Sequence, residues 1–133
     1  MTLYLEPLEK ALASLDRGLV RFRGAPGDEE LRDARIQRFE YSFELCWKLL
    51  KRRLEMDLAD AGEVDGYSKR RLFWIGGERG LVRDVESWFD YLAKRNLTSH
   101  TYNAREAQLV AGILDRFAED ARHLLNRLGA IDD

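Results

Sequence analysis

The sequence has very few residues that cross-link or interrupt a chain. It contains one cysteine, Cys46, and two prolines, Pro7 and Pro26, in 133 residues. A single cysteine excludes an internal disulfide, and its place inside an apolar run predicts a buried small hydrophobic residue. This cysteine usage suits a reducing compartment, so we expect a cytoplasmic protein. Because no proline follows residue 26, long helices are compatible with the whole remainder of the chain.

Long apolar runs and an excess of one charge are also missing. No segment approaches the length of about 18 apolar residues that a membrane-spanning helix needs, so we expect no membrane association. The N-terminal residues have no basic start and do not resemble a signal peptide. The formal net charge is -2, so a polyanion would have to bind a local patch rather than the whole molecule. The length predicts a single domain over residues 1–133.

Apolar residues recur instead at steps of three and four, the period of amphipathic helices. Three such series are Leu5, Leu8, Leu12, Leu15, Leu19 and Phe22; Ile36, Phe39, Phe43, Cys46 and Leu50; and Ala107, Val110, Leu114, Phe117, Ala121, Leu124 and Leu128. Nothing indicates a strand. The sequence therefore predicts an all-α fold, an antiparallel up-down helical bundle of four to five helices.

Local signals place the boundaries of these helices. The second helix is expected from about residue 28 to about residue 59, followed by a turn over residues 60–67. Ser68 can cap a short helix that the glycines after Ile75 weaken. Another helix starts near Asp84, and Asn103 caps a single long helix that reaches the C-terminal region.

The second helix is apolar on two sides. Tyr41, Leu45 and Leu49 lie on a different side from the Ile36–Leu50 series, and a helix with this pattern is either central or faces a partner chain. We therefore expect a homodimer. On the polar strip, Glu44 and Lys48 have the spacing of a surface ion pair.

The most concentrated chemistry lies between the last two long helices, from Arg95 to Tyr102. Arg95 and His100 could meet if the preceding helix ends near Asn96 or Leu97. A guanidinium binds phosphate oxygens with two parallel hydrogen bonds, and an imidazole can move a proton near neutral pH. The pair suits a phosphodiester, although a histidine in a loop is more often an ordinary polar residue.

These residues carry a resemblance to a known family. Arg95, His100 and Tyr102 match the R-x4-H-x-Y motif of HEPN-domain ribonuclease toxins. The run Asp90-Tyr91-Leu92 before this motif, and the run Arg38-Phe39-Glu40-Tyr41-Ser42-Phe43-Glu44-Leu45-Cys46-Trp47-Lys48 on the second helix, resemble one branch. That branch is the nucleotidyltransferase substrate-binding proteins, and the resemblance spans nearly the whole chain.

The resemblance implies a helical bundle that dimerises and pairs with a minimal nucleotidyltransferase. It implies a toxin–antitoxin pair, in which the toxin is a metal-independent endoribonuclease and the antitoxin silences it by AMP transfer. Arg95 would then stabilise the phosphate of an RNA substrate, His100 would act in proton transfer, and Tyr102 would accept the AMP. An older interpretation of the family implies a non-catalytic subunit that binds substrate for the transferase.

Two functional classes therefore remain beside ribonuclease: the binding subunit and a helical interaction module with a merely structural loop. No cluster has metal-ligand spacing and no cofactor motif is present, so neither a metal nor a cofactor is expected.

His123 and Asp120 are interpreted as residues of the solvated, polar side of the last helix. The short basic clusters Lys51-Arg52-Arg53 and Lys69-Arg70-Arg71 are compatible with RNA or an acidic partner, but such runs are usually only solvated.

Overall fold

The computed structural model describes residues 3–58, 60–98 and 103–131, and these residues form helices without any strand. The helices are α1 (Glu6–Gly24), α2 (Glu29–Asp57), α3 (Ala61–Val64), α4 (Lys69–Glu78), α5 (Val85–Thr98), α6 (Ala104–Ala111) and α7 (Leu114–Ile131). The predicted all-α bundle is confirmed. None of the helices in the described part of the chain is both long and apolar enough to cross a membrane.

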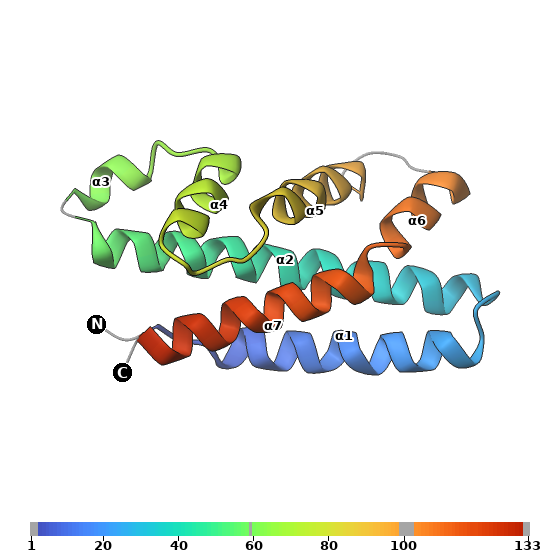
Figure 1. Ribbon diagram of the computed structural model, residues 1–133. Helices are drawn as coiled ribbons and strands as arrows, with labels where there is room; N and C mark the ends of the chain where they lie inside the picture. Colours follow the sequence, from blue (N-terminus) through green and yellow to red (C-terminus); the bar gives the residue numbers. More distant parts are fainter. Residues whose placement is uncertain (1–2, 59, 99–102, 132–133) are drawn as a thin grey trace.

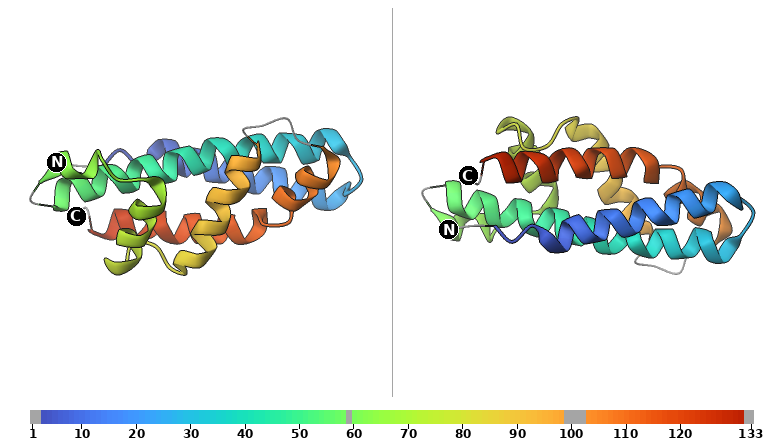
Figure 2. Two further views of the ribbon diagram at one scale, coloured as in Figure 1. Left: turned by 90° about the horizontal axis from the view of Figure 1, so that it is seen from above. Right: turned by 90° about the horizontal axis from the view of Figure 1, so that it is seen from below.

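Helix α2 runs through the middle of the molecule (Figure 1). Helix α1 is antiparallel to it, and α7 packs along both α1 and α2. Helices α4 and α5 lie on the side of α2 opposite α1, α5 also contacts α7, and α6 leads from the end of α5 back to α7 (Figures 1 and 2). This arrangement places the C-terminal end of α5 over the middle of α2.

Side-chain caps explain why several of these helices start where they do. The Asp28 carboxylate accepts hydrogen bonds from the first backbone N–H groups of α2, at 2.9 and 3.2 Å. The Ser68 hydroxyl accepts from the Arg71 N–H at 3.1 Å, and the Asn103 side chain accepts from the Glu106 N–H at 3.0 Å. Each cap satisfies backbone donors that a helix start leaves without an intrahelical partner. The predicted caps at Ser68 and Asn103 are confirmed.

The core is a cluster of aromatic rings between α2, α4, α5 and α7. Phe43 of α2 contacts Phe73, Trp88 and Phe117, with ring centroids 5.7, 6.5 and 6.4 Å apart. All four side chains are buried, as is Cys46, which confirms its predicted role. Because α2 supplies the centre of this cluster, the packing of these rings holds α4, α5 and α7 in place against α2.

The number of helices differs from the predicted four to five. The expected long C-terminal helix is divided into α6 and α7 at Gly112 and Ile113, and the expected turn over residues 60–67 contains α3. Helix α4 continues through Gly76 and Gly77, where the missing side chains let it pack closely against its neighbours. A Cβ at Gly77 would lie 2.1 Å from Val85 Cγ2, so these glycines bring α4 against its neighbours.

Candidate functional site

Arg95 lies near the C-terminal end of α5 and points to α2. Its Nε is 3.3 Å from Glu44 Oε1, and its Nη1 is 3.8 Å from Glu40 Oε2. The side chains of Arg95, Glu40 and Glu44 are only 22%, 29% and 29% exposed. A guanidinium between two partly buried carboxylates is held in one orientation.

The end of α5 also restrains Arg95. Its Nη1 donates to the Thr98 hydroxyl at 3.0 Å, and that hydroxyl donates to the Arg95 backbone carbonyl at 2.7 Å. Helix α5 continues to Thr98, one or two residues beyond the end that the sequence suggested. His100 and Tyr102 lie outside the described residues, so their predicted roles stay predictions.

Glu44 is more than the surface residue that the sequence predicted, and Glu40 lies beside it. Burial raises the pKa of Glu40, while the charge of Arg95 lowers it and that of Glu44 raises it. Glu44 accepts a hydrogen bond from Trp47 Nε1 at 3.0 Å and contacts Arg95. The expected pair with Lys48 is not among the ion pairs of the described residues, and Lys48 lies over the Trp47 ring instead. Sequence reasoning missed this because Glu44 and Arg95 are far apart in the chain.

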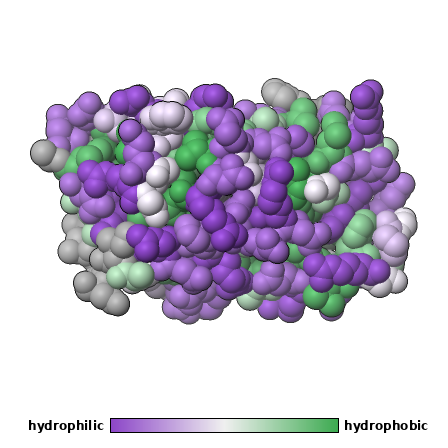
Figure 3. Space-filling model, in the orientation of Figure 1, coloured by the Kyte–Doolittle hydropathy of each residue, from purple (hydrophilic) through white to green (hydrophobic). Residues whose placement is uncertain are grey.

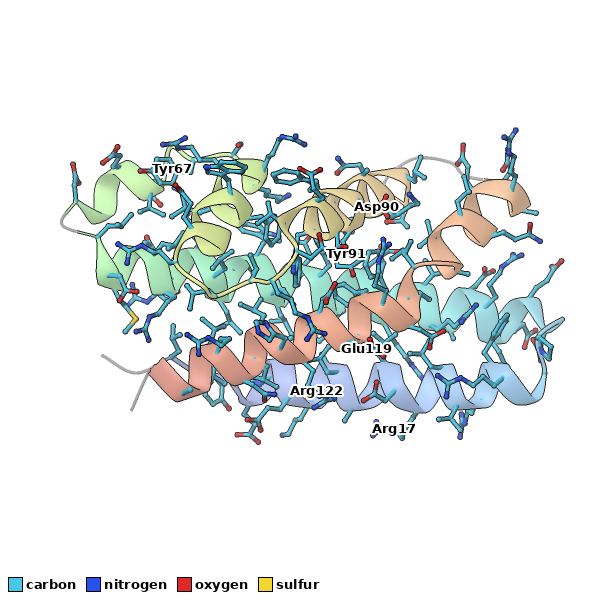
Figure 4. All side chains as sticks on the ribbon, in the orientation of Figure 1. Arg17, Tyr67, Asp90, Tyr91, Glu119 and Arg122 are labelled. Atoms are coloured by element: carbon cyan, nitrogen blue, oxygen red, sulfur yellow. The ribbon has the colours of Figure 1, made fainter. Side chains whose placement is uncertain are left out.

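A buried polar network fastens α5 to α7. Tyr91 donates to the buried Asp120 carboxylate, which also accepts from Arg83 Nε at 2.9 Å, and Arg116 Nε donates to the Tyr91 oxygen at 3.2 Å. Figure 4 labels Tyr91 between α5 and α7, with Asp90 beside it on α5. Asp120 is therefore not on a solvated face, contrary to its assignment from the sequence.

Two cations extend this network to Asp90. Its carboxylate accepts from Lys94 Nζ at 2.7 Å and from Arg116 Nη2 at 2.6 Å. Burial opposes ionisation of Asp90, but Lys94 and Arg116 outweigh it and hold the pKa of this carboxyl below its ordinary value. The network thus orients the helix that carries Arg95.

Tyr91→Phe is expected to lower the free energy of unfolding by about 1–3 kcal/mol, because buried Asp120 loses a donor while the ring stays in place. Burial and Asp120 raise the pKa of Tyr91 above its ordinary value of 10.0. The folded state therefore keeps this proton when the unfolded state has lost it, and the tyrosine's contribution to stability falls as pH rises above about 10. Urea unfolding at neutral and alkaline pH measures both effects. A variant as stable as wild type at neutral pH would contradict the network's role.

The second apolar side of α2 is only partly exposed. Tyr41 is 60% exposed, whereas Leu45 and Leu49 pack against the core. Tyr41 and Tyr4 line a pocket of about 610 Å³ between α1 and α2. The predicted homodimer is therefore supported by less apolar surface than the sequence suggested, and it stays a prediction.

His123 is also less solvated than predicted. It is half-buried, and burial lowers its pKa, as do the charges of Arg83 and Arg127, while Asp120 raises it. It lies on α7 beside the polar network rather than at Arg95.

Comparison with known proteins supports the resemblance. The family described as nucleotidyltransferase substrate binding protein like matches residues 3–130. A curated Haemophilus influenzae relative, named "Probable ribonuclease HepT", is 33% identical over 93 residues, which are 70% of this chain and 64% of the relative. The match thus spans less than two thirds of that relative's length.

Two solved structures are also similar. One is a Haemophilus influenzae protein whose structure is described as revealing the fold of a substrate-binding domain of a nucleotidyltransferase. The TM-score is 0.87, the two sequences are 29% identical, and the match covers 95% of this chain and 99% of that one. The other, from Thermus thermophilus, has a TM-score of 0.73 and 34% identity, and covers 91% and 98% of the two chains. Fold, sequence match and nearly complete coverage agree, and the chain belongs to the nucleotidyltransferase substrate-binding protein-like family.

Proposed function

We propose that the chain is a HEPN-type toxin subunit that cleaves RNA without a metal ion and is silenced by AMP transfer from a cognate nucleotidyltransferase. The observation that carries this proposal is Arg95, a partly buried guanidinium held between Glu40 and Glu44 at the end of α5. It stands at the start of the R-x4-H-x-Y motif, and a similar protein is named as a probable ribonuclease.

The chemistry proposed is attack of a ribose 2′-oxygen on the adjacent phosphorus. A base takes the proton of the 2′-hydroxyl, the bond to the 5′-oxygen breaks, and an acid protonates that leaving oxygen. His100 supplies proton transfer and Arg95 stabilises the charge that develops on the phosphate oxygens. Glu40 and Glu44 are positioning residues, because they orient the guanidinium before RNA binds.

One chain supplies one motif histidine, whereas this reaction uses both a base and an acid. A two-fold dimer that brings two motif loops to one cleft would supply a second histidine and a second arginine. We therefore expect a homodimer in solution. Light scattering at micromolar concentration measures this directly, and a monomer would remove the argument for a composite site.

The rival function is a non-catalytic subunit that binds substrate for the transferase. It is favoured by the description of the similar Haemophilus influenzae structure as a substrate-binding domain. One measurement distinguishes the two functions: cleavage of RNA by the purified protein in the presence of EDTA. Cleavage that depends on Arg95 supports the ribonuclease, and intact RNA supports the binding subunit.

A further inference from the structure

Three cations and three aromatic rings gather around the first turn of α4. The pairs, with the distance from the cation to the ring centroid, are Lys69 with Trp47 (4.9 Å), Arg70 with Phe89 (3.8 Å) and Arg71 with Tyr67 (5.0 Å). We call Lys69, Arg70, Arg71, Trp74 and Phe89 the α4 patch. Figure 4 labels Tyr67, just before the start of α4.

The cations of the α4 patch are not ion-paired within the described part of the chain. Lys69, Arg70 and Arg71 make no ion pair with a carboxylate among those residues, in contrast to Lys51, which pairs with Asp65 at 2.8 Å. Arg70 and Arg71 are exposed. Three cations that lie against rings rather than carboxylates keep their capacity to bind an external anion.

An exposed indole lies beside these cations. Trp74 is 52% exposed and lines a surface pocket of about 400 Å³ together with Ser68, Arg70, Arg71, Glu86 and Phe89. The face drawn in Figure 3 is mainly hydrophilic, with smaller areas of intermediate and hydrophobic residues. An exposed ring among cations offers a stacking surface for a nucleobase next to donors for its phosphates.

The α4 patch is connected to Arg95 by direct contacts. Lys69 lies over the ring of Trp47, Trp47 Nε1 donates to Glu44 at 3.0 Å, and Glu44 is 3.3 Å from Arg95. Trp47 and Glu44 are on α2, which passes beneath both α4 and α5 (Figure 1). A strand bound at Arg95 could therefore continue along this side of the molecule to α4.

We propose that the α4 patch is a second binding site for the RNA, which holds a single-stranded segment beside the cleavage site. Lys69, Arg70 and Arg71 bind backbone phosphates and Trp74 stacks on one base. Stacking requires an unpaired base, which favours a single strand over a duplex. This inference rests on the proposed function and deepens it by naming the form of RNA and where it binds. An acidic protein surface is the competing occupant.

The test is fluorescence anisotropy with a labelled single-stranded RNA, measured in a His100→Ala background so that the RNA is not consumed. Each phosphate contact on a single strand contributes about 0.7 to the slope of log affinity against log salt concentration. The combined variant Lys69→Gln, Arg70→Gln and Arg71→Gln should therefore reduce this slope by about 2. Trp74→Ala should weaken binding on the order of tenfold with an unchanged slope, because stacking is lost and charge is not.

The matched control is Lys10→Gln, Arg17→Gln and Arg21→Gln, which removes the same charge from exposed positions on α1. This control should keep the wild-type slope. Glu86→Gln gives a test of opposite sign, because it removes the carboxylate that lines the pocket and should tighten binding. Equal losses in the α4 and α1 variants, or no loss in either, would overturn the inference.

The outcomes also separate this inference from the proposed function. RNA binding that depends on the α4 patch, without cleavage by the wild-type chain, contradicts the ribonuclease and supports the second site. If cleavage requires Arg95 but the α4 variants bind RNA as tightly as wild type, the ribonuclease is supported and the second site is overturned. If the α4 variants instead lose a protein partner or the dimer in light scattering while RNA affinity is unchanged, the patch is a protein interface and the inference is wrong.

Discussion

Arg95→Ala is expected to lower the rate of RNA cleavage by about 100- to 1,000-fold, the usual effect of removing one group that stabilises charge in the transition state. His100→Ala should cause a loss of about 100-fold or more, because it removes proton transfer. Both wild-type cleavage and these losses should be the same with EDTA present. The measurement is the initial rate of cleavage of a labelled RNA.

Arg95 also separates two glutamates, so its variants need a structural control. Arg95→Ala leaves Glu40 and Glu44 side by side on α2 without their shared cation, and some stability should be lost. Arg95→Lys keeps the charge but loses the planar fork, and it should retain the fold while recovering only part of the activity. Arg17→Ala, at an exposed position on α1, should cleave like wild type. Cleavage that requires a divalent ion, or that survives His100→Ala in a folded protein, would refute the proposed roles.

Tyr102→Phe is expected to abolish AMP addition completely, since the phenolic oxygen is the proposed nucleophile. This oxygen would attack the α-phosphorus of ATP, release pyrophosphate and lose its proton, which leaves AMP joined to the ring oxygen. The new phosphate could pair with the Arg95 guanidinium and occupy the place of the RNA phosphate. Silencing would then need no change of fold. Intact-mass spectrometry after incubation with the cognate transferase and ATP measures the addition.

Two exposed tyrosines provide matched controls for this experiment. Tyr4 and Tyr41 are 69% and 60% exposed, so Tyr4→Phe and Tyr41→Phe should still gain the mass of AMP. Labelling of Tyr102→Phe at the wild-type level would place the modification elsewhere. If neither wild type nor variant is labelled, the substrate-binding function becomes the better explanation of the family resemblance.

The sequence by itself determined the all-α fold and which face of each long helix is buried. Periodic apolar residues specify which face of a helix is buried, and short-range caps such as Asp28, Ser68 and Asn103 specify where a helix begins. Both signals depend on residues within a few positions of one another. The division between α6 and α7 was not predicted, since Gly112 and Ile113 interrupt a series whose apolar period continues without a break.

Only the tertiary structure decided what surrounds Arg95. Glu40, Glu44 and Arg95 are brought together because α5 packs across α2, and the packing of α4 on α2 joins Trp47 to Lys69. Asp120 is a second example. The pattern of its own helix predicts an exposed residue, but Tyr91 and Arg83 from elsewhere in the chain bind its carboxylate and bury it. The charge and burial of a side chain depend on which helices meet, and that choice is made by the whole core rather than by neighbouring residues.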